Sequence, residues 1–582
     1  MSLRMLAFRR QARESGRVPV TRRSLVLLLL LPAAACATPA FDLMLYDGNI
    51  YTGDPRHPKA EVVLVRDGRI TYVGTKAEAN LLPAGAGPQR VIDLHGATVL
   101  PGLNDAHLHL SGVGFRELSF DLEGSTGIPD LRAKLQARIA QAGPKRWIVG
   151  RGWIETHWTP AVFPRARDLD DISPDNPVVL KRADGHAIAV NSLALKLAGI
   201  GRSTPNPPGG EILRDPATGE ATGMLVDQAM RLVERLVPSS TAAETERALV
   251  IGAAREVALG WTGVQNAGTS FEEAELTRRL VAEGKIKLRV YDAVSGPGPA
   301  AEKLLQAGPV IGESGGRYTR RGVKLYIDGA LGSRGAALLA PYADAPSRGL
   351  LMQQEADLRP FLEQALRRGL QVETHAIGDL GNRLMLDWYE KAFAAVPPLE
   401  RLIPEPRWRI EHAQILSPAD IPRFARLGII ASMQPSHAIG DLYFAPARLG
   451  PARLAGAYAW QSLLESGAVL AAGSDAPVER GEPMIEFYAA VARRSPDGFA
   501  NADWHLEQRM TRAQALQALT LSAAFATFQE KERGTIEPGK LADFTVLSAD
   551  IMQIPEAEIL HTRCLMTIVG GEVVYEAKPA GP

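Results

Sequence analysis

Several residues suited to metal chemistry stand where short apolar runs end, and His107 and His109 are the first of them. On a β-strand, residues two apart point to the same side, so both imidazoles would face one place. Two imidazoles at one place suit a divalent metal ion. The pair alone is weak evidence, because two ordinary polar histidines can have the same spacing.

Later apolar runs each add one further candidate ligand at the end of the run. These candidates are Lys324, His375, His412 and Asp475. Imidazole and carboxylate suit zinc-type metals. A protonated lysine cannot ligate, whereas a lysine carboxylated by CO₂ could bridge two metal ions. Each candidate has a structural alternative: an ion pair between Lys324 and Asp328, an N-cap role for Asp475, and core packing for the two histidines.

The elements that must position these side chains alternate strand and helix along the chain. The expected strands are 98–103, 263–266, 288–293, 322–327, 370–375, 409–412, 429–433 and 469–473, and the expected helices include 242–259, 271–283, 355–368, 382–395 and 455–466. Eight β/α units in series predict an α/β fold, the (β/α)₈ TIM barrel. The active site of such a barrel lies at the carboxyl ends of its strands, where the candidate ligands fall.

The two ends of the chain are β-rich, with hairpin signals such as Asp47-Gly48 between apolar runs. We therefore expect residues 41–98 and 533–582 to form one small β-sandwich domain, and 99–532 to form the barrel domain. Two unrelated caps are the alternative. Residues 112–240 exceed the length of one loop, so we expect an inserted, lid-like subdomain there.

Residues 1–36 are typical of an export leader. Arginines precede an apolar run at 25–31 that is too short to span a bilayer as a stable helix. Small residues before Cys36 resemble a bacterial lipobox, so we expect lipid on Cys36 and a periplasm-facing, membrane-anchored protein. A plain signal-peptidase site near Ala37 is the alternative, and Arg22-Arg23 leaves twin-arginine export open.

The composition excludes several classes of protein. Lys+Arg and Asp+Glu number 65 each, so the chain has no excess of basic residues that would suggest nucleic-acid binding. Its hydrophobic fraction of 46% is ordinary for a globular protein. Only two cysteines occur, one of them in the leader, so no disulfide framework is expected. The expected partner is a small-molecule substrate, and a homodimer is compatible with the sequence.

The motifs, taken in order, resemble those of the amidohydrolase superfamily of metal-dependent hydrolases, and within it the branch of N-substituted formamide deformylase. They include Pro101-Gly-Leu-Asn-Asp-Ala-His-Leu-His, Val323-Lys-Leu-Tyr-Ile-Asp-Gly, His375-Ala-Ile-Gly-Asp, Glu411-His412 and Gly473-Ser-Asp475. The resemblance covers about residues 41–580. It extends into the predicted insert, through Asp184-Gly-His186 and Gly209-Gly210.

The resemblance implies a hydrolase with two divalent metals, Zn²⁺ being the first choice. His107, His109 and Asp475 would hold one metal, His375 and His412 the other, and carboxylated Lys324 would bridge them. A metal-bound hydroxide would attack the substrate carbonyl, and Asp475 would pass the proton to the leaving amine.

Three more residues could contact substrate in such an enzyme. His186 would contact substrate or stabilise the oxyanion, and its alternative is a surface-loop histidine. Arg334 would clamp a polar substrate group, with a structural ion pair as the alternative. Tyr326 would line the pocket, with core packing as the alternative. Trp153, Trp158 and His437 could line the same pocket, and core packing is again the alternative for the aromatic side chains.

We therefore expect an exported amidohydrolase that cleaves an amide or N-formyl C–N bond. A mononuclear, deaminase-like centre would use His107, His109, one more histidine and Asp475, with Lys324 only structural. An ester or lactone hydrolase on the same fold is a second alternative. A non-catalytic binding protein is the third, and the complete ligand set argues against it.

Overall fold

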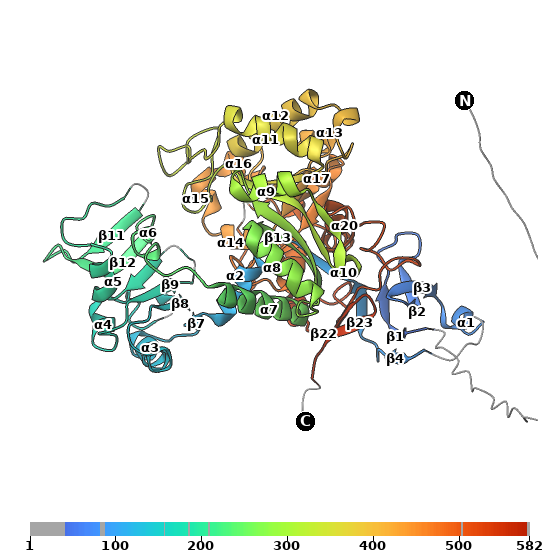
Figure 1. The fold of residues 1–582 in the computed structure, drawn as a ribbon, viewed down its shortest axis with the longest axis horizontal. Coiled ribbons are helices and arrows are strands. Elements are labelled where there is room, and N and C mark those ends of the chain that lie inside the picture. Colours follow the sequence, from blue (N-terminus) through green and yellow to red (C-terminus); the bar gives the residue numbers. More distant parts are fainter. Residues whose placement is uncertain are drawn as a thin grey trace, which may run out of the picture.

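The structure is a computed structural model that describes residues 41–81, 88–155, 158–183, 185, 187–207, 210–501 and 504–578. The predicted leader with Cys36 lies outside the described residues, and so do Asp184, His186 and Gly209. A central barrel lies between an inserted sheet on one side and a sheet of terminal strands on the other (Figure 1).

Eight parallel strands form a nearly closed barrel, which confirms the predicted (β/α)₈ TIM fold. In order they are β6 (Leu103–Leu108), β13 (Trp261–Thr269), β14 (Arg289–Ser295), β16 (Tyr318–Tyr326), β17 (Gln371–Ala376), β18 (Arg409–His412), β19 (Ile430–Met433) and β20 (Leu470–Ala472). Their apolar sequences follow from burial on both faces, as for β18 and β19, in which every residue is buried. β15 (Val310–Gly312) adds one antiparallel pair to β16.

Helices connect the barrel strands. They include α7 (Ala242–Leu259), α8 (Phe271–Ala282), α9 (Pro299–Ala307), α11 (Glu355–Arg368), α12 (Asp379–Ala395), α13 (Ile421–Leu427), α17 (Trp460–Glu465) and α18 (Pro483–Ala492). Local sequence sets the limits of α7: Thr241 and Glu244 form a capping box, and Gly260 at φ 108° ends the helix. The helix predicted at 455–466 is shorter, because Ala457 bridges to Ile415 and Tyr458 has φ 49°.

The prediction that residues 98–103 form the opening strand of the barrel is wrong. Residues Thr98–Pro101 form β5, which pairs with β1 (Leu43–Tyr51) and β21 (Phe544–Leu547) in the terminal sheet, and β6 opens the barrel instead. The chain passes between the two sheets at Gly102. A Cβ there would lie 2.4 Å from Thr262 Oγ1 and 2.8 Å from the Asp543 Cβ, so only glycine fits. The boundary therefore lies at Gly102 rather than after residue 98.

Strands from both ends of the chain form one hydrogen-bonded sheet. Its order is β23-β22-β21-β5-β1-β2-β3, with β4 paired to β1, and the remaining bounds are β2 (Lys59–Arg66), β3 (Arg69–Gly74), β4 (Arg90–Asp93), β22 (Cys564–Val569) and β23 (Glu572–Glu576). One apolar cluster includes Leu43 and Val63 from the N-terminal strands and Phe544 and Ile568 from the C-terminal ones. The strands of one chain end do not form this apolar cluster alone, so the sheet requires strands from both ends.

The insert is a six-stranded sheet with its own apolar clusters. Its order is β11-β12-β10-β9-β8-β7, with bounds β7 (Phe120–Asp121), β8 (Ile148–Trp153), β9 (Val178–Arg182), β10 (Ala187–Val190), β11 (Gly210–Arg214) and β12 (Ala221–Asp227). The predicted start at residue 112 falls inside α2 (Leu110–Leu118), which packs on α7 of the barrel. A Cβ on Gly114 would lie 1.7 Å from the Ala248 carbonyl oxygen, so these two helices touch backbone to backbone. The inserted sheet begins at Phe120.

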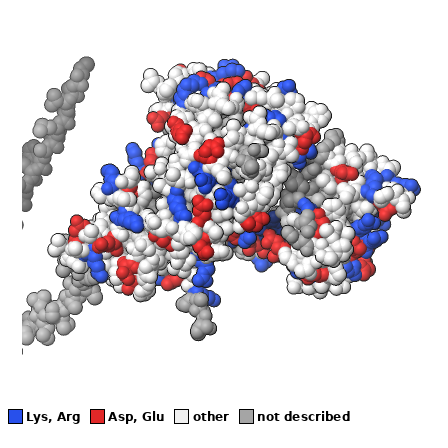
Figure 2. Space-filling model, turned by 180° about the vertical axis from the view of Figure 1, so that it is seen from behind, with Lys and Arg blue, Asp and Glu red and all other residues white. Residues whose placement is uncertain are grey.

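Charged side chains of both signs are intermixed on the face drawn in Figure 2. This distribution agrees with the equal numbers of acidic and basic residues in the sequence. Among the described residues, no helix has the length and apolar content needed to cross a bilayer.

Candidate metal centre

The structure brings all six predicted ligands together at the carboxyl ends of the barrel strands. His107 and His109 come from the end of β6, Lys324 from β16, His375 from β17, His412 from β18, and Asp475 from the loop after β20. His109 Nε2 lies 3.2 Å and His107 Nε2 3.6 Å from Asp475 Oδ1. Lys324 Nζ lies 2.9 Å from His107 Nε2.

The four imidazole rings form one continuous cluster. Ring centroids are 4.5 Å apart for His375 and His412, 5.2 Å for His107 and His412, and 5.5 Å for His107 and His109. Ligand atoms of His107, His412 and Asp475 all lie within 4.8 Å of one another. A single cation could therefore contact groups from the first, sixth and eighth barrel strands.

Asp105 fastens the first strand of the barrel to the eighth. Its Oδ1 accepts hydrogen bonds from the backbone amides of His107 (3.0 Å) and Ser474 (2.9 Å), and its Oδ2 accepts one from Ser474 Oγ. The Asp475 amide also donates to the His107 carbonyl oxygen at 2.7 Å. A Cβ on Gly473 would lie 2.4 Å from the His107 nitrogen, so glycine permits this approach. These bonds close the barrel where its ladder of strand pairs ends.

The backbone is strained at two of the ligands. His412 has φ 73° and Asp475 has φ 57°, a region that residues other than glycine rarely adopt. Neighbouring residues of a regular strand point to opposite faces, yet Glu411 and His412 both contact groups inside the barrel. The left-handed conformation of His412 breaks that alternation. Strain of this kind is typical of functional sites.

Three of the histidines are tied at Nδ1, which leaves Nε2 directed at the centre. Nδ1 of His107 lies 2.5 Å from Glu411 Oε2, Nδ1 of His109 lies 2.8 Å from the Ala267 carbonyl oxygen, and Nδ1 of His412 lies 2.8 Å from Gln434 Oε1. All three partner oxygens are acceptors, so each Nδ1 carries the proton. The Nε2 lone pair is then the one that could ligate a metal, the pattern typical of metal-bound histidines, and in His107 it now contacts Lys324 Nζ.

Burial and neighbouring charge keep His107, His375 and His412 neutral at ordinary pH. Burial, with Lys324 nearby, lowers the pKa of His107 to about 4 and that of His375 to about 3. Burial also holds the pKa of His412 well below its usual range. Neutral imidazole is the form that binds a metal.

The two other candidate ligands also have shifted pKa values. Burial would raise the pKa of Asp475, but the contact with His109 and the neighbouring imidazoles bring it well below its ordinary value. Burial lowers the pKa of Lys324, although Glu411 and Asp475 oppose that shift. Asp475 is therefore a carboxylate, and Lys324 has a larger neutral fraction than an exposed lysine.

The donor set fits a divalent metal. Asp475 Oδ1 and His375 Nε2 are buried, and neither has a hydrogen-bond partner among the described residues. Buried polar atoms without partners are costly unless a ligand satisfies them. Four imidazoles and a carboxylate suit zinc-type ions, so a cation would satisfy these atoms.

Lys324 and Asp328, both described residues, do not form the ion pair that is the structural alternative to metal binding by Lys324. Asp328 instead accepts hydrogen bonds from the backbone amides of Ala337, Ile377 and Gly378, at 2.8 to 3.0 Å. It therefore shapes the loops after β16 and β17, while Lys324 points at His107.

The predicted substrate residues have different surroundings. Tyr326 is 36% exposed, and its ring centroid lies 5.5 Å from that of His375, at the edge of the centre. Arg334 makes two hydrogen bonds to Asp344, at 3.0 and 2.8 Å, so its guanidinium is occupied by an ion pair. Its role toward substrate stays a prediction. His186 lies outside the described residues.

Two residues at the centre, Glu411 and Gln434, are not assigned there from the sequence, and His437 is expected only to line the pocket. Glu411 binds His107, Gln434 binds His412, and His437 Nε2 lies 3.5 Å from Asp475 Oδ2. The motif Glu411-His412 was visible in the sequence, and Gln434 and His437 follow β19. Their position after a barrel strand was the available signal, since every barrel strand end faces the same mouth.

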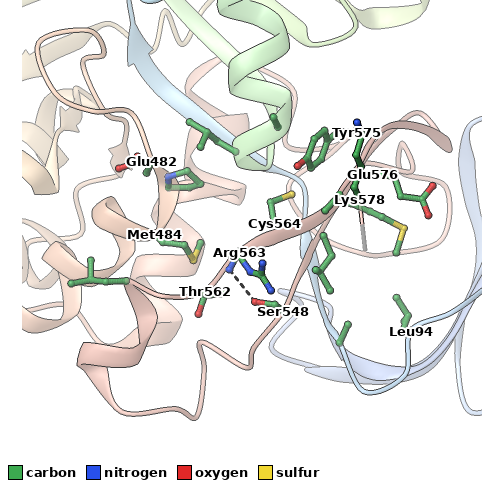
Figure 3. A pocket seen from close by; sticks show the side chains of 18 of the residues that line it. Leu94, Glu482, Met484, Ser548, Thr562, Arg563, Cys564, Tyr575, Glu576 and Lys578 are labelled. Carbon is green, nitrogen blue, oxygen red and sulfur yellow. Dashed lines mark hydrogen bonds between the residues drawn. The ribbon is translucent and has the colours of Figure 1, made fainter. Parts of the chain in front are cut away.

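A cavity of about 1220 Å³ lies elsewhere, between the terminal sheet and the barrel. Figure 3 shows Met484, Cys564 and Tyr575 among its lining side chains. None of the six predicted ligands lines it, so we place the functional site at the strand ends instead.

Comparison with known proteins adds three findings. The model of the family described as "Amidohydrolase family" matches residues 90–575. One curated relative is Protein LONG AFTER FAR-RED 3 of Arabidopsis thaliana, which is 37% identical over 92% of this chain and 91% of the relative. Another is N-substituted formamide deformylase of Arthrobacter pascens, which is 29% identical over 92% of this chain and 98% of the relative. The crystal structure of an uncharacterized metal-dependent hydrolase from Pyrococcus horikoshii OT3 has a TM-score of 0.71 and 26% identity, covering 88% of this chain and 99% of that one.

Proposed function

The chain belongs to the amidohydrolase family of metal-dependent hydrolases, and from that premise we propose that it hydrolyses a C–N bond of a small amide, with N-formyl amines as the first candidates. One relative is named for the deformylation of N-substituted formamides, and it is matched along nearly its whole length. This relative favours the formyl group without fixing it, because one fold can serve many substrates.

The observation that carries the proposal is the cluster of four imidazoles beside the Asp475 carboxylate, among which His107 and His412 are buried and neutral. Nδ1 of His107, His109 and His412 is tied to an acceptor, so each Nε2 is available to a cation. In an ordinary core, buried polar atoms have hydrogen-bond partners, whereas here the imidazoles surround a carboxylate oxygen, Asp475 Oδ1, that has none among the described residues.

We assign two metal positions to these residues. His107, His109 and Asp475 would hold one ion, and His375 with His412 would hold the second. When bound, such ions acidify a water molecule and polarise the carbonyl group of the substrate. Zn²⁺ is the first choice for imidazole and carboxylate ligands.

Lys324 is assigned to bridge the two positions as a carbamate. Its neutral amine would attack CO₂, the nitrogen would lose one proton, and the product would be a carboxylate on the side chain. Burial favours this step because it lowers the pKa of Lys324 and raises the fraction of neutral amine. The amine already points at the ligand cluster, 2.9 Å from His107 Nε2.

Asp475 is assigned as the proton carrier. It is a buried carboxylate among the ligands, so it can accept a proton from the attacking water and release it to the leaving nitrogen. Tyr326, at the exposed edge of the cluster, would border the acyl side of the substrate.

A mononuclear, deaminase-like centre is the second candidate, and one observation favours it. The ligand atoms that lie within 4.8 Å of one another are those of His107, His412 and Asp475, which suffice for one ion. Lys324 would then act as a cation that orients His107.

A substrate panel tests the proposed function. Purified enzyme should be offered N-formyl amines, longer N-acyl amines, cyclic amides, aminated heterocycles, esters and lactones, each before and after metal removal by a chelator. The proposal predicts metal-dependent release of free amine from the amides. Turnover of esters alone, or release of ammonia from heterocycles alone, would contradict it.

A further inference from the structure

His437 lies in α14 (Pro435–Asp441), the helix that begins directly after barrel strand β19. The seventh strand supplies none of the six ligands assigned above, yet two side chains at the start of the helix that follows it contact those ligands. Gln434, the N-cap of α14, binds His412, and His437, three residues later, faces Asp475. Residues three apart lie on one face of a helix, so a single turn presents both side chains.

The two oxygens of Asp475 have different neighbours. Oδ1 lies 3.2 Å from His109 Nε2 and 3.6 Å from His107 Nε2, on the ligand side. Oδ2 lies 3.5 Å from His437 Nε2. The carboxylate therefore lies between the ligand histidines and His437, with one oxygen toward each.

The His437 ring is held in place but its Nε2 has no hydrogen-bond partner within the described chain. The side chain is 12% exposed, and its ring stacks on His412 with centroids 5.7 Å apart and planes 18° apart. Since the atom that Nε2 faces is a carboxylate oxygen, the favoured tautomer carries the proton on Nε2.

The backbone of Asp475 is already fixed, because its amide donates to the His107 carbonyl oxygen. The remaining freedom is rotation of the carboxylate about its last torsion, which is broad and roughly two-fold in aspartate. A half turn would only exchange two equivalent oxygens, but a partial rotation would move both of them away from the ligand side.

We propose that His437 is a positioning residue, which donates Nε2–H to Asp475 Oδ2 and so keeps Oδ1 on the metal side of the centre. This inference rests on the proposed metal centre, and it assigns to the seventh strand a part in building it. Outer partners of metal ligands typically affect metal affinity or activity by about 10- to 100-fold, so the effect is measurable.

The test compares three variants with metal-stripped wild type. His437→Phe keeps a ring that can stack on His412 but has no donor, whereas His437→Gln keeps a donor and loses the ring. His561→Phe, at an exposed position, is the matched control. Zn²⁺ affinity is measured by competition with a chelator in the absence of substrate, and kcat and KM are measured separately.

We expect His437→Phe to bind Zn²⁺ about 10- to 100-fold more weakly and to lower kcat with little change in KM. His437→Gln should recover part of the affinity, and His561→Phe should match wild type. Equal affinity in wild type and His437→Phe, or equal losses in the Phe and Gln variants, would overturn the inference, because only packing would then matter. Since affinity is read without substrate, a failure of the amide panel leaves this test unaffected.

Discussion

Glu411 Oε2 lies 2.5 Å from Nδ1 of His107, and both side chains are fully buried. Burial would raise the pKa of Glu411, but His107, Arg409 and Lys324 bring it below its usual value. The carboxylate therefore fixes the ring of His107 and makes its Nε2 a better electron donor to a metal.

Replacing Glu411 by Gln keeps the shape and removes the charge. We expect Glu411→Gln to lose about 10- to 100-fold in metal affinity or in kcat/KM. The matched control is Glu363→Gln on the outer helix α11, whose carboxylate pairs with Arg359. Chelator competition and steady-state kinetics check both variants. A Glu411→Gln protein that behaves like Glu363→Gln would show that the charge has no role.

Lys324→Ala separates the binuclear assignment from the mononuclear one. In the binuclear case the variant loses the bridging carboxylate, so it should bind less metal and lose orders of magnitude in rate. A short carboxylic acid in the buffer should restore part of both. Lys303→Ala, an exposed lysine on α9, is the control. Thermal unfolding must accompany elemental analysis, because removing one buried charge can destabilise the fold. One metal per chain, kept in an active Lys324→Ala, would favour the mononuclear centre.

The buried pair of Arg289 and Asp543 joins the barrel to the terminal sheet, with Arg289 Nε 2.6 Å from Asp543 Oδ2. Burial would raise the pKa of Asp543, but Arg289 more than offsets this and the pKa is lowered. A carboxylate with a lowered pKa contributes stability above its unfolded pKa of about 3.9, and that stability is lost as the pH falls toward its lower folded value.

Asp543→Asn should therefore unfold at a lower urea concentration at neutral pH, consistent with a loss of about 3–5 kcal/mol for a broken buried pair. The difference from wild type should shrink as the pH falls below about 4, because the unfolded wild type then takes up a proton at Asp543 while the folded protein keeps the carboxylate ionised to a lower pH. Asp357→Asn, at an exposed position of α11, is the control and should show neither effect. A constant difference across this pH range would refute the assignment.

The leader carries a separate prediction, since it lies outside the described residues. If Cys36 is lipidated, wild type should fractionate with membranes, and Cys36→Ser should yield a soluble or unprocessed form. Ala37→Ser, the next residue, is the matched control and should stay with the membranes. Membrane fractionation and mass spectrometry of the mature N-terminus check this. A soluble wild type that begins at another residue would contradict lipid anchoring.

Strand periodicity and the strand-end positions of the ligands sufficed to predict the barrel and to select the six residues that cluster. The opening strand could not be predicted, because residues 98–103 read as one apolar run. The change of sheet at Gly102 depends on Thr262 and Asp543, which are distant in sequence. In the same way, the contacts of Gln434 with His412 and of His437 with Asp475 become recognisable only when the strand ends meet.

The conformation of His412 is a further limit of sequence reasoning. Regular alternation would place Glu411 and His412 on opposite faces of β18. The structure places both inside, because His412 has φ 73°. A glycine at this position would have suggested a positive φ, because glycine adopts it readily. Histidine carries no such signal, so the sequence does not predict this conformation.

The most direct test titrates Zn²⁺ into metal-stripped enzyme while bound metal and the hydrolysis of an N-formyl amine are measured together. The account predicts that the stripped protein is inactive, that turnover rises with bound metal, and that both reach a plateau at two equivalents per chain. Asp475→Asn should bind less metal and lose turnover under the same conditions. Full turnover in the metal-free protein would contradict the account at its centre.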